Sequence, residues 1–262
     1  MSFTLHTGTV PMLVSMPHIG TLIPQELQSS FVRRALAVED TDWHLARLYD
    51  FLPELGISVL QPQMSRYVID LNRPPDDAPM YPGAANTELC PTRFFTGDAL
   101  YKTGQEPSAQ EVQRRCSAYW QPYHDALAGE LQRVKAHHGF ALLWDAHSIR
   151  SHIPWLFEGK LADLNLGTAS GLSASNAITN AAAGQTQGFT HVVDGRFKGG
   201  YITRHYGQPA QHIHAVQLEK CQSLYMTESP PYAYNKALAG QLQPTLKRMV
   251  QASLQAARDL YA

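Results

Sequence analysis

The sequence predicts an α/β fold with a largely parallel sheet. Short apolar runs alternate with segments whose apolar residues recur at helical spacing, which is the rhythm of strands connected by helices. The chain contains no internal repeat, low-complexity tract or linker. Its 262 residues, 44% of them apolar, are enough to bury a sizeable core, so we expect a single domain over residues 1–262.

The first part of the chain reads as a strand, helix, strand unit. Residues 10–16 predict a strand, and residues 41–55 place apolar side chains at helical spacing. Gly56 ends the helical pattern, and residues 57–60 predict the next strand. Residues 67–71 are a further strand candidate.

A stretch with little periodicity, 74–104, separates this unit from the second half of the chain. It is punctuated by Pro and Gly, and long loops in compact domains are often functional, so we expect an active-site flap or rim. A long helix is expected from Ser108, which has capping-box spacing to Glu111, as far as Gly139, with a kink at Pro122.

The second half continues the same alternation. The expected elements are a buried strand at 140–144, a small-residue helix at 170–184, a short strand at 191–194, a Gly-rich loop at 195–207, a strand at 212–218 and a helix at 235–260 interrupted at Pro244.

The charge content excludes two classes of protein. Charged residues make up 16% of the chain, against about 25% in an average protein, and 21 basic side chains face 22 acidic ones. This is too little charge for a disordered solvating segment and too little basic excess for an electrostatic nucleic-acid binder. The 12 histidines indicate chemistry near neutral pH or a metal.

The cysteines and the N-terminal residues bear on the compartment. Cys90, Cys116 and Cys221 are odd in number and form no CxxC, which favours buried free thiols in a reducing compartment. Residues 1–20 lack the pattern of a signal peptide, and no run approaches the roughly 18 apolar residues of a membrane span. We expect a cytoplasmic protein that acts on a small molecule, without nucleic-acid or membrane partners; its oligomeric state stays open.

Polar residues follow four predicted strands, where open α/β sheets bind their ligands. They are His18, then Asp70, Asn72 and Arg73, then Asp145 and His147, and finally Gln217 and Glu219. Residues two apart on a strand share a face, so Asp145 could support His147 as a hydrogen-bond partner or could bond a neighbouring backbone amide.

Each of these residues also has a structural explanation. His18 could be a turn residue, Asp70 to Arg73 a salt-bridged strand end, and Glu219 half of a structural ion pair, because an unpaired buried carboxylate costs several kcal/mol. Together they favour catalytic zinc chemistry, in which two histidines and a carboxylate bind the metal and a nearby glutamate moves protons. Arg73 and Arg204 offer planar forks for substrate carboxylates. A serine nucleophile finds little support, because no Gly-x-Ser-x-Gly occurs.

Five motifs together resemble the N-formylglutamate amidohydrolase family, over a region from about Thr9 to Glu228. They are Ser-Met-Pro-His-Ile-Gly around His18, the runs 65–74, 144–150 and 195–207, and Gln-Leu-Glu ending at Glu219. The resemblance implies one zinc-dependent hydrolase domain with the three-layer phosphorylase/hydrolase-like fold that zinc carboxypeptidases and aspartoacylase share. It also implies release of formate from N-formyl-L-glutamate in histidine degradation.

The resemblance further implies roles for individual residues. His18 and His147 would bind one zinc ion per chain, with another divalent metal as the alternative, and Glu219 would be the general base. Asn72 and Arg73 match the pair that holds a substrate carboxylate, and Arg66 matches an oxyanion-stabilising arginine.

The chain departs from the carboxypeptidase pattern His-x-x-Glu at one position, since Thr21 stands where the glutamate would be. The carboxylate ligand must therefore come from elsewhere. Asp42 is the family-like choice, followed by Asp40 and Glu39, although this acidic cluster could also reflect the preference of helix starts for carboxylates. A related N-acyl amino acid deacylase, a carboxypeptidase or amidase, and a non-catalytic binding protein remain alternative functions.

Overall fold

The computed structural model describes residues 2–79 and 87–262, so part of the predicted flap, 80–86, lies outside the described residues. Seven strands form one mixed sheet in the order β1-β3-β2-β4-β7-β5-β6. The strands are β1 (Phe3–His6), β2 (Met12–Ser15), β3 (Ser58–Pro62), β4 (Ala141–Ile149), β5 (Leu164–Gly167), β6 (His191–Val193) and β7 (Ile213–Cys221). The pairs β1/β3 and β5/β7 are antiparallel and the other neighbours are parallel, which confirms the α/β prediction.

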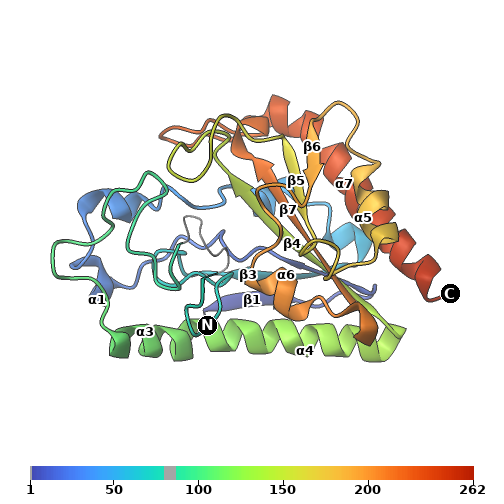
Figure 1. Cartoon of the computed structure of the whole chain (residues 1–262), viewed down its shortest axis with the longest axis horizontal. Helices are drawn as coiled ribbons and strands as arrows, with labels where there is room; N and C mark the ends of the chain where they lie inside the picture. Colours follow the sequence, from blue (N-terminus) through green and yellow to red (C-terminus); the bar gives the residue numbers. More distant parts are fainter. Residues whose placement is uncertain (1, 80–86) are drawn as a thin grey trace.

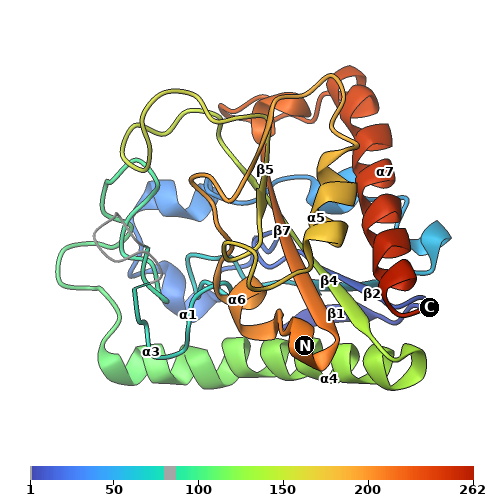
Figure 2. The same cartoon turned by 45° about the vertical axis from the view of Figure 1, so that its right-hand side comes forward.

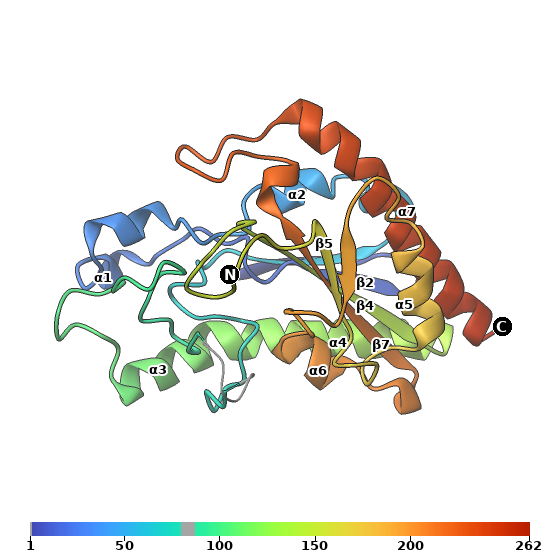
Figure 3. The same cartoon turned by 45° about the horizontal axis from the view of Figure 1, so that its top comes forward.

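Helices cover both faces of the sheet. They are α1 (Gln25–Gln28), α2 (Leu45–Leu48), α3 (Ala109–Arg115), α4 (Gln121–His138), α5 (Asn176–Ala183), α6 (Tyr201–Tyr206) and α7 (Lys236–Leu260). Figure 1 shows α5 and α7 on one side of the sheet and the long α4 on the other. In Figure 3, α2 and α7 lie above the sheet, and α4 and α6 lie below it. This is the expected three-layer architecture.

The alternation of side chains along the central strands divides the core into two clusters. On β4, Trp144 packs with Leu246 of α7, whereas its neighbour Leu143 packs with Leu127 of α4. Every residue of β2, β4 and β7 is buried. Strands covered on both faces read as continuous apolar runs, which is why these three were recognisable in the sequence.

The strand predictions at 10–16, 57–60, 140–144, 191–194 and 212–218 are confirmed by β2, β3, β4, β6 and β7. However, β4 and β7 continue to Ile149 and Cys221, so the polar residues expected after these strands lie within them. The short strands β1 and β5, four residues each, were not predicted.

The predicted strand at 67–71 is wrong, because this segment forms turns. The amide of Val68 donates to the carbonyl of Ser65 (2.9 Å), and that of Asp70 donates to Leu89 (2.7 Å). Tyr67 and Val68 are buried in a separate apolar cluster with Phe94, away from the sheet. An apolar run is buried both in a core strand and in a buried turn, so the apolar residues of 67–71 did not distinguish a strand from turns.

Two predicted helices are shorter than expected. In 41–55, α2 spans only Leu45–Leu48, because His44 before it adopts a left-handed conformation (φ 62°). In 170–184, α5 begins at Asn176, since the preceding turn contains Ala169 and Ser170 at positive φ.

The helix predicted at 108–139 is confirmed, and Ser108 caps it by accepting a hydrogen bond from the amide of Glu111. Its irregularity precedes Pro122: the turn Cys116–Trp120 is π-helical. A proline lacks the amide hydrogen of a regular helical turn and clashes with the preceding turn, and a widened turn accommodates both effects.

Two further expectations about helices are corrected. The predicted interruption at Pro244 is wrong, because α7 continues through this residue. Packing of its buried face, including Leu242 and Leu246, outweighs one missing hydrogen bond. The predicted loop at 195–207 contains α6. Within the described ranges, no helix combines the length and the apolarity that crossing a membrane requires.

Candidate active site

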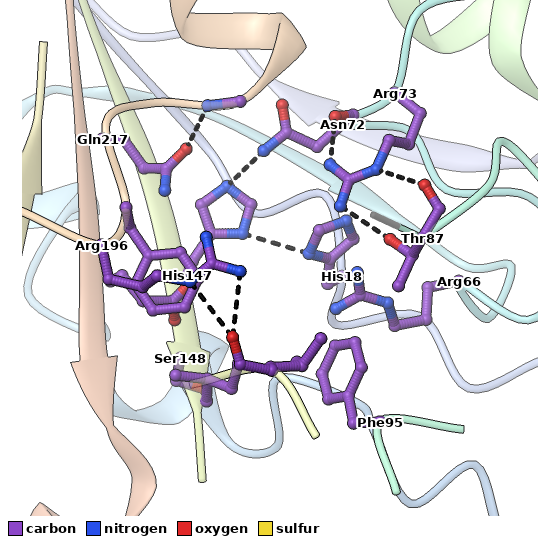
Figure 4. A pocket seen from close by; sticks show the side chains of 15 residues that line it. His18, Arg66, Asn72, Arg73, Thr87, Phe95, His147, Ser148, Arg196 and Gln217 are labelled. Atoms are coloured by element: carbon purple, nitrogen blue, oxygen red, sulfur yellow. Dashed lines mark hydrogen bonds between the residues drawn. The ribbon is translucent and has the colours of Figure 1, made fainter. Parts of the chain in front are cut away.

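A cavity lies along the carboxyl-terminal halves of β4 and β7. Seven of the residues singled out in the sequence line it, namely His18, Arg66, Asn72, Arg73, His147, Gln217 and Glu219. Figure 4 shows the two histidines in the middle of this group, with Arg66 and Arg73 to one side of them. His147 and Glu219 are cross-strand partners in the β4/β7 pair, so the register of the sheet itself places them side by side.

Two histidines and one aspartate converge at the floor of the cavity. His18 Nδ1 lies 3.1 Å from His147 Nδ1 and 3.8 Å from Asp42 Oδ2, and His147 Nδ1 lies 3.4 Å from the same oxygen. All three side chains are buried, and the group could hold a metal ion. The ligand atoms of a tetrahedral zinc ion are separated by roughly 3.3 Å, so these spacings fit zinc.

Each histidine contacts a further carboxylate through its other ring nitrogen. His18 Nε2 lies 2.7 Å from Asp70 Oδ1, and His147 Nε2 lies 2.9 Å from Asp145 Oδ2. Of the two alternatives that the sequence left open for Asp145, the structure shows the contact with His147. Such carboxylates fix the orientation of the ring and direct the lone pair of Nδ1 toward a metal.

The electrostatics of the cluster favour a positive charge at its centre. Burial alone would lower the pKa of both histidines. Around His147, the carboxylates of Asp145, Asp42 and Glu219 outweigh burial and raise its pKa to about 10. At His18, burial together with nearby Arg66 keeps the pKa below its ordinary value. A cation between the rings would meet the negative potential that raises the pKa of His147.

Among the acidic residues that the sequence left open, Asp42 is the one beside the histidines. Its Oδ2 accepts a hydrogen bond from the amide of Ser148, directly after His147 (3.1 Å). Asp40 turns away, and accepts from the amide of Phe95 (2.9 Å) and from Arg150 (2.8 Å).

The remaining positions agree with this arrangement. Glu39 forms an ion pair with Arg34. Thr21, which stands at the carboxypeptidase glutamate position, is exposed. The acidic cluster does not open a helix either, since α2 begins only at Leu45.

Glu219 is buried beside this cluster. Its Oε1 has no hydrogen-bond partner within the part of the chain that the structure describes. Burial and the nearby Asp42 raise its pKa to about 8, against the opposing effects of His147 and Lys220. A carboxylate of this kind can accept and return a proton near neutral pH.

Three arginines line the cavity, and they have different surroundings. Arg66 forms an ion pair with Asp70 (2.6 Å) and lies over the ring of Phe95. Arg73 donates to the carbonyl and hydroxyl oxygens of Thr87 (2.9 and 2.7 Å) and to the carbonyl of Asn72 (3.0 Å). Across residues 2–79 and 87–262, no carboxylate forms an ion pair with Arg73.

The third arginine of the cavity is Arg196, not Arg204. Within the described residues, Arg204 is absent from the lining, and its Nε donates to the carbonyl of Gly199 (2.8 Å). The helix α6 was not predicted, and it determines the direction in which Arg204 points. Arg196 lies in the same Gly-rich run, 195–207, but nothing in that motif favoured Arg196 over Arg204 as the residue that binds a substrate carboxylate.

Sequence reasoning also assigned no role to two other residues of the site. Asp70 contacts both His18 and Arg66. The Asp-Leu-Asn-Arg motif includes this residue, but nothing in the motif indicated these two contacts. Phe95 comes from the stretch without periodicity, where no pattern could single it out.

A buried cluster of two histidines and an aspartate beside a buried glutamate, within the parallel strands of an α/β fold, is typical of hydrolytic enzymes. Residues 10–226 match the family described as N-formylglutamate amidohydrolase. Two curated N-formylglutamate deformylases are each 50% identical to this chain. The Pseudomonas aeruginosa protein aligns over 97% of both chains, and the Pseudomonas putida protein over 96% of this chain and 95% of its own. The chain belongs to the N-formylglutamate amidohydrolase family.

Solved structures agree with this fold. A crystal structure of N-formylglutamate amidohydrolase from Ralstonia eutropha has a TM-score of 0.82 at 23% identity, covering 98% of this chain and 97% of that one. A gene product of Agrobacterium tumefaciens has a TM-score of 0.71 at 16% identity, covering 96% and 94%. At these identities the likeness concerns the fold alone.

Proposed function

We propose that this chain hydrolyses N-formyl-L-glutamate to formate and L-glutamate, as a step of histidine degradation in the cytoplasm. The observation that carries the proposal is one cavity lined by His18, His147, the buried Glu219 and Arg73, with Asp42 beside the two histidines. Family membership and the names of the two curated relatives support the choice of substrate.

His18, Asp42 and His147 would hold one metal ion. Two imidazoles and a carboxylate suit zinc, and another divalent ion of similar size is the alternative. When bound, such an ion polarises the formyl carbonyl and makes a water molecule more acidic.

Glu219 is proposed as the group that moves the proton. It accepts a proton from the water that attacks the formyl carbon and then delivers it to the amide nitrogen of glutamate. The new C–O bond forms and the C–N bond breaks, so the products are formate and the free amine. Arg66, held by Asp70, is proposed to donate to the oxygen of the formyl group as negative charge develops on it.

Asn72 and Arg73 are proposed to hold a carboxylate of the substrate. Arg73 keeps a fixed orientation through Thr87, and its guanidinium has donor hydrogens beyond those bonds. Asn72 Nδ2 lies 3.1 Å from His147 Nε2, the ring nitrogen that faces Asp145, so this pair adjoins a proposed metal ligand. A formyl group offers little surface, and recognition therefore depends on the glutamate part of the substrate.

The test is release of formate and free amine from a panel of N-formyl, N-acetyl and N-succinyl amino acids, with protein loaded with zinc. We expect N-formyl-L-glutamate to have the highest kcat/KM, and activity to disappear with a chelator and return with zinc. Preference for an N-acetyl or N-succinyl substrate would instead identify a related deacylase. Full activity of metal-free protein would refute the proposed metal dependence.

A further inference from the structure

We propose that Arg196 binds the side-chain carboxylate of the substrate and thereby determines the preference for glutamate. This inference rests on the proposed function and adds a specificity residue to it. A substrate with two carboxylates requires two cationic contacts, and Arg73 with Asn72 provides one. The second must come from another cation that lines the same cavity.

The cavity offers Arg66 and Arg196 for this contact. Arg66, held by Asp70 beside His18, is already assigned to the oxygen of the formyl group. Arg204, the candidate from the sequence, is outside the lining formed by the described residues. Arg196 is therefore the arginine whose position suits a second carboxylate.

The surroundings of Arg196 fix its guanidinium in the cavity wall. Its Nε and Nη2 both donate to the carbonyl of Leu156 (3.3 and 3.2 Å). The neighbouring Phe197 packs against Phe157 at a ring distance of 6.3 Å, within a small apolar cluster of its own. A planar fork held by an apolar support loses little freedom when it binds a carboxylate in two-point fashion.

The position of Arg196 indicates the side-chain carboxylate as its ligand. In the view of Figure 4, Arg196 and Arg73 lie on opposite sides of the two histidines. Asn72 lies against the imidazole of His147, and the α-carboxylate is the carboxylate nearer to the scissile amide, so we assign it to the pair of Asn72 and Arg73. The side-chain carboxylate of glutamate lies two methylene groups further from the amide nitrogen, and an arginine across the cavity suits it.

The experiment compares kcat/KM for N-formyl-L-glutamate and N-formyl-L-glutamine, which differ only in the charge of the side chain. We expect Arg196→Met to reduce kcat/KM for the glutamate substrate about 100-fold and to change that for the glutamine substrate less than about threefold. Arg196→Lys should recover part of the preference, because it keeps the charge but loses the planar fork.

Lys198→Gln is the matched control. It removes a positive charge from the same loop, its side chain is exposed, and it does not line the cavity. We expect it to leave the preference unchanged. Inhibition by L-glutamate compared with L-glutamine gives the same comparison if turnover of N-formyl-L-glutamine is too slow to measure.

The outcomes separate this inference from the proposed function. If the unmodified protein does not hydrolyse N-formyl-L-glutamate, the proposed function fails. If it does, and Arg196→Met keeps the preference of the unmodified protein for glutamate over glutamine, the role of Arg196 is wrong. An equal loss in Lys198→Gln would show a general effect of charge and would also overturn it. Loss of the preference in Arg204→Met but not in Arg196→Met would return the role to Arg204.

Discussion

Glu219 combines burial with an oxygen that has no hydrogen-bond partner in the described part of the chain. A structural carboxylate in this position would be paired, because burying an unpaired one is costly. We expect Glu219→Gln to retain zinc and to reduce kcat by about 10³-fold, the usual effect of removing a general base. Elemental analysis together with formate release measures both quantities. A near-normal kcat would show that another residue moves the proton.

Asp42 and Asp40 are two residues apart and have different surroundings. Asp42 lies beside both histidines, whereas Asp40 anchors the loop that contains Phe95. We expect Asp42→Ala to lose bound zinc and activity together. Asp40→Asn should keep its zinc and chiefly raise KM, because Phe95 forms part of the cavity wall. Zinc content by elemental analysis distinguishes them, and loss of zinc only in Asp40→Asn would reverse the assignment.

The histidines and Glu219 were predictable because strands alternate and each motif ends a recognisable apolar run. The choice of Asp42 over Asp40 came from the family resemblance and agrees with the cluster that the structure shows. Residue spacing alone left it open, since it depends on the turn before His44, whose left-handed conformation no pattern revealed. Likewise, the choice between Arg196 and Arg204 depends on where α6 begins. Spacing along the chain gives residue identity and order, but the direction of a side chain in a turn depends on tertiary contacts.

At the scale of elements, α4 and α6 hold the segment that contains Asn72. His124 Nε2 of α4 donates to the carbonyl of Leu71 (2.9 Å), and Trp120 Nε1 donates to the carbonyl of Arg73 (3.0 Å). From α6, the amide of Ile202 donates to Asn72 Oδ1 (2.8 Å). The π-helical turn ends at Trp120, so the irregularity of the helix coincides with its contact to the proposed substrate-binding pair.

The contact of His124 makes this region sensitive to acid. Burial lowers the pKa of His124 from 6.5 to about 3 in the folded protein. The unfolded chain therefore binds a proton that the folded chain does not, and stability falls as the pH decreases from about 6.5 toward 3. The contribution of His124 amounts to about 2 kcal/mol between pH 7 and pH 5.

Urea unfolding at both pH values measures this contribution. The loss of stability on acidification should be about 2 kcal/mol smaller in His124→Gln than in the unmodified protein. His137→Gln, an exposed histidine on the same helix, is the control and should keep the original dependence. An equal loss in the unmodified protein and in His124→Gln would show that His124 is protonated in the folded state.

The elements that were predicted correctly are those whose burial pattern is determined locally. Strands β2, β4 and β7 are buried on both faces. The long helix begins with the Ser108 cap of α3 and continues into α4, which buries Leu127, Leu131 and Val134. The segment 67–71 is also largely apolar but forms no strand: Tyr67 and Val68 lie in a separate cluster with Phe94, and Ile69 and Leu71 lie in the core cluster that contains Leu143 of β4. Its structure depends on those partners, which a single sequence does not identify.

At the scale of the whole molecule, the net charge of −1 conceals two groups of charged side chains at one cavity. Asp42, Asp70 and Asp145 lie beside the two histidines, and Arg66, which pairs with Asp70, lines the cavity together with Arg73 and Arg196. The first group suits a cation and the second suits an anionic substrate. Figure 2 shows the loops near α1 and α3 at the end of the molecule away from α7. The helix-covered sheet is therefore the scaffold from which these loops extend.

The proposed metal would connect three distant parts of the chain, since His18 follows β2, Asp42 precedes α2, and His147 lies in β4. A ligand that binds only the folded state stabilises it, by about 2.7 kcal/mol at a concentration 100 times its Kd. For a protein of this size, this corresponds to a rise in Tm of about 5–10 °C. We expect zinc to raise the Tm of metal-free protein by this amount. In His147→Ala the rise should be absent, because the remaining two ligands bind zinc weakly. An equal rise in both proteins would place the zinc-binding site elsewhere in the chain and would separate metal binding from this cavity.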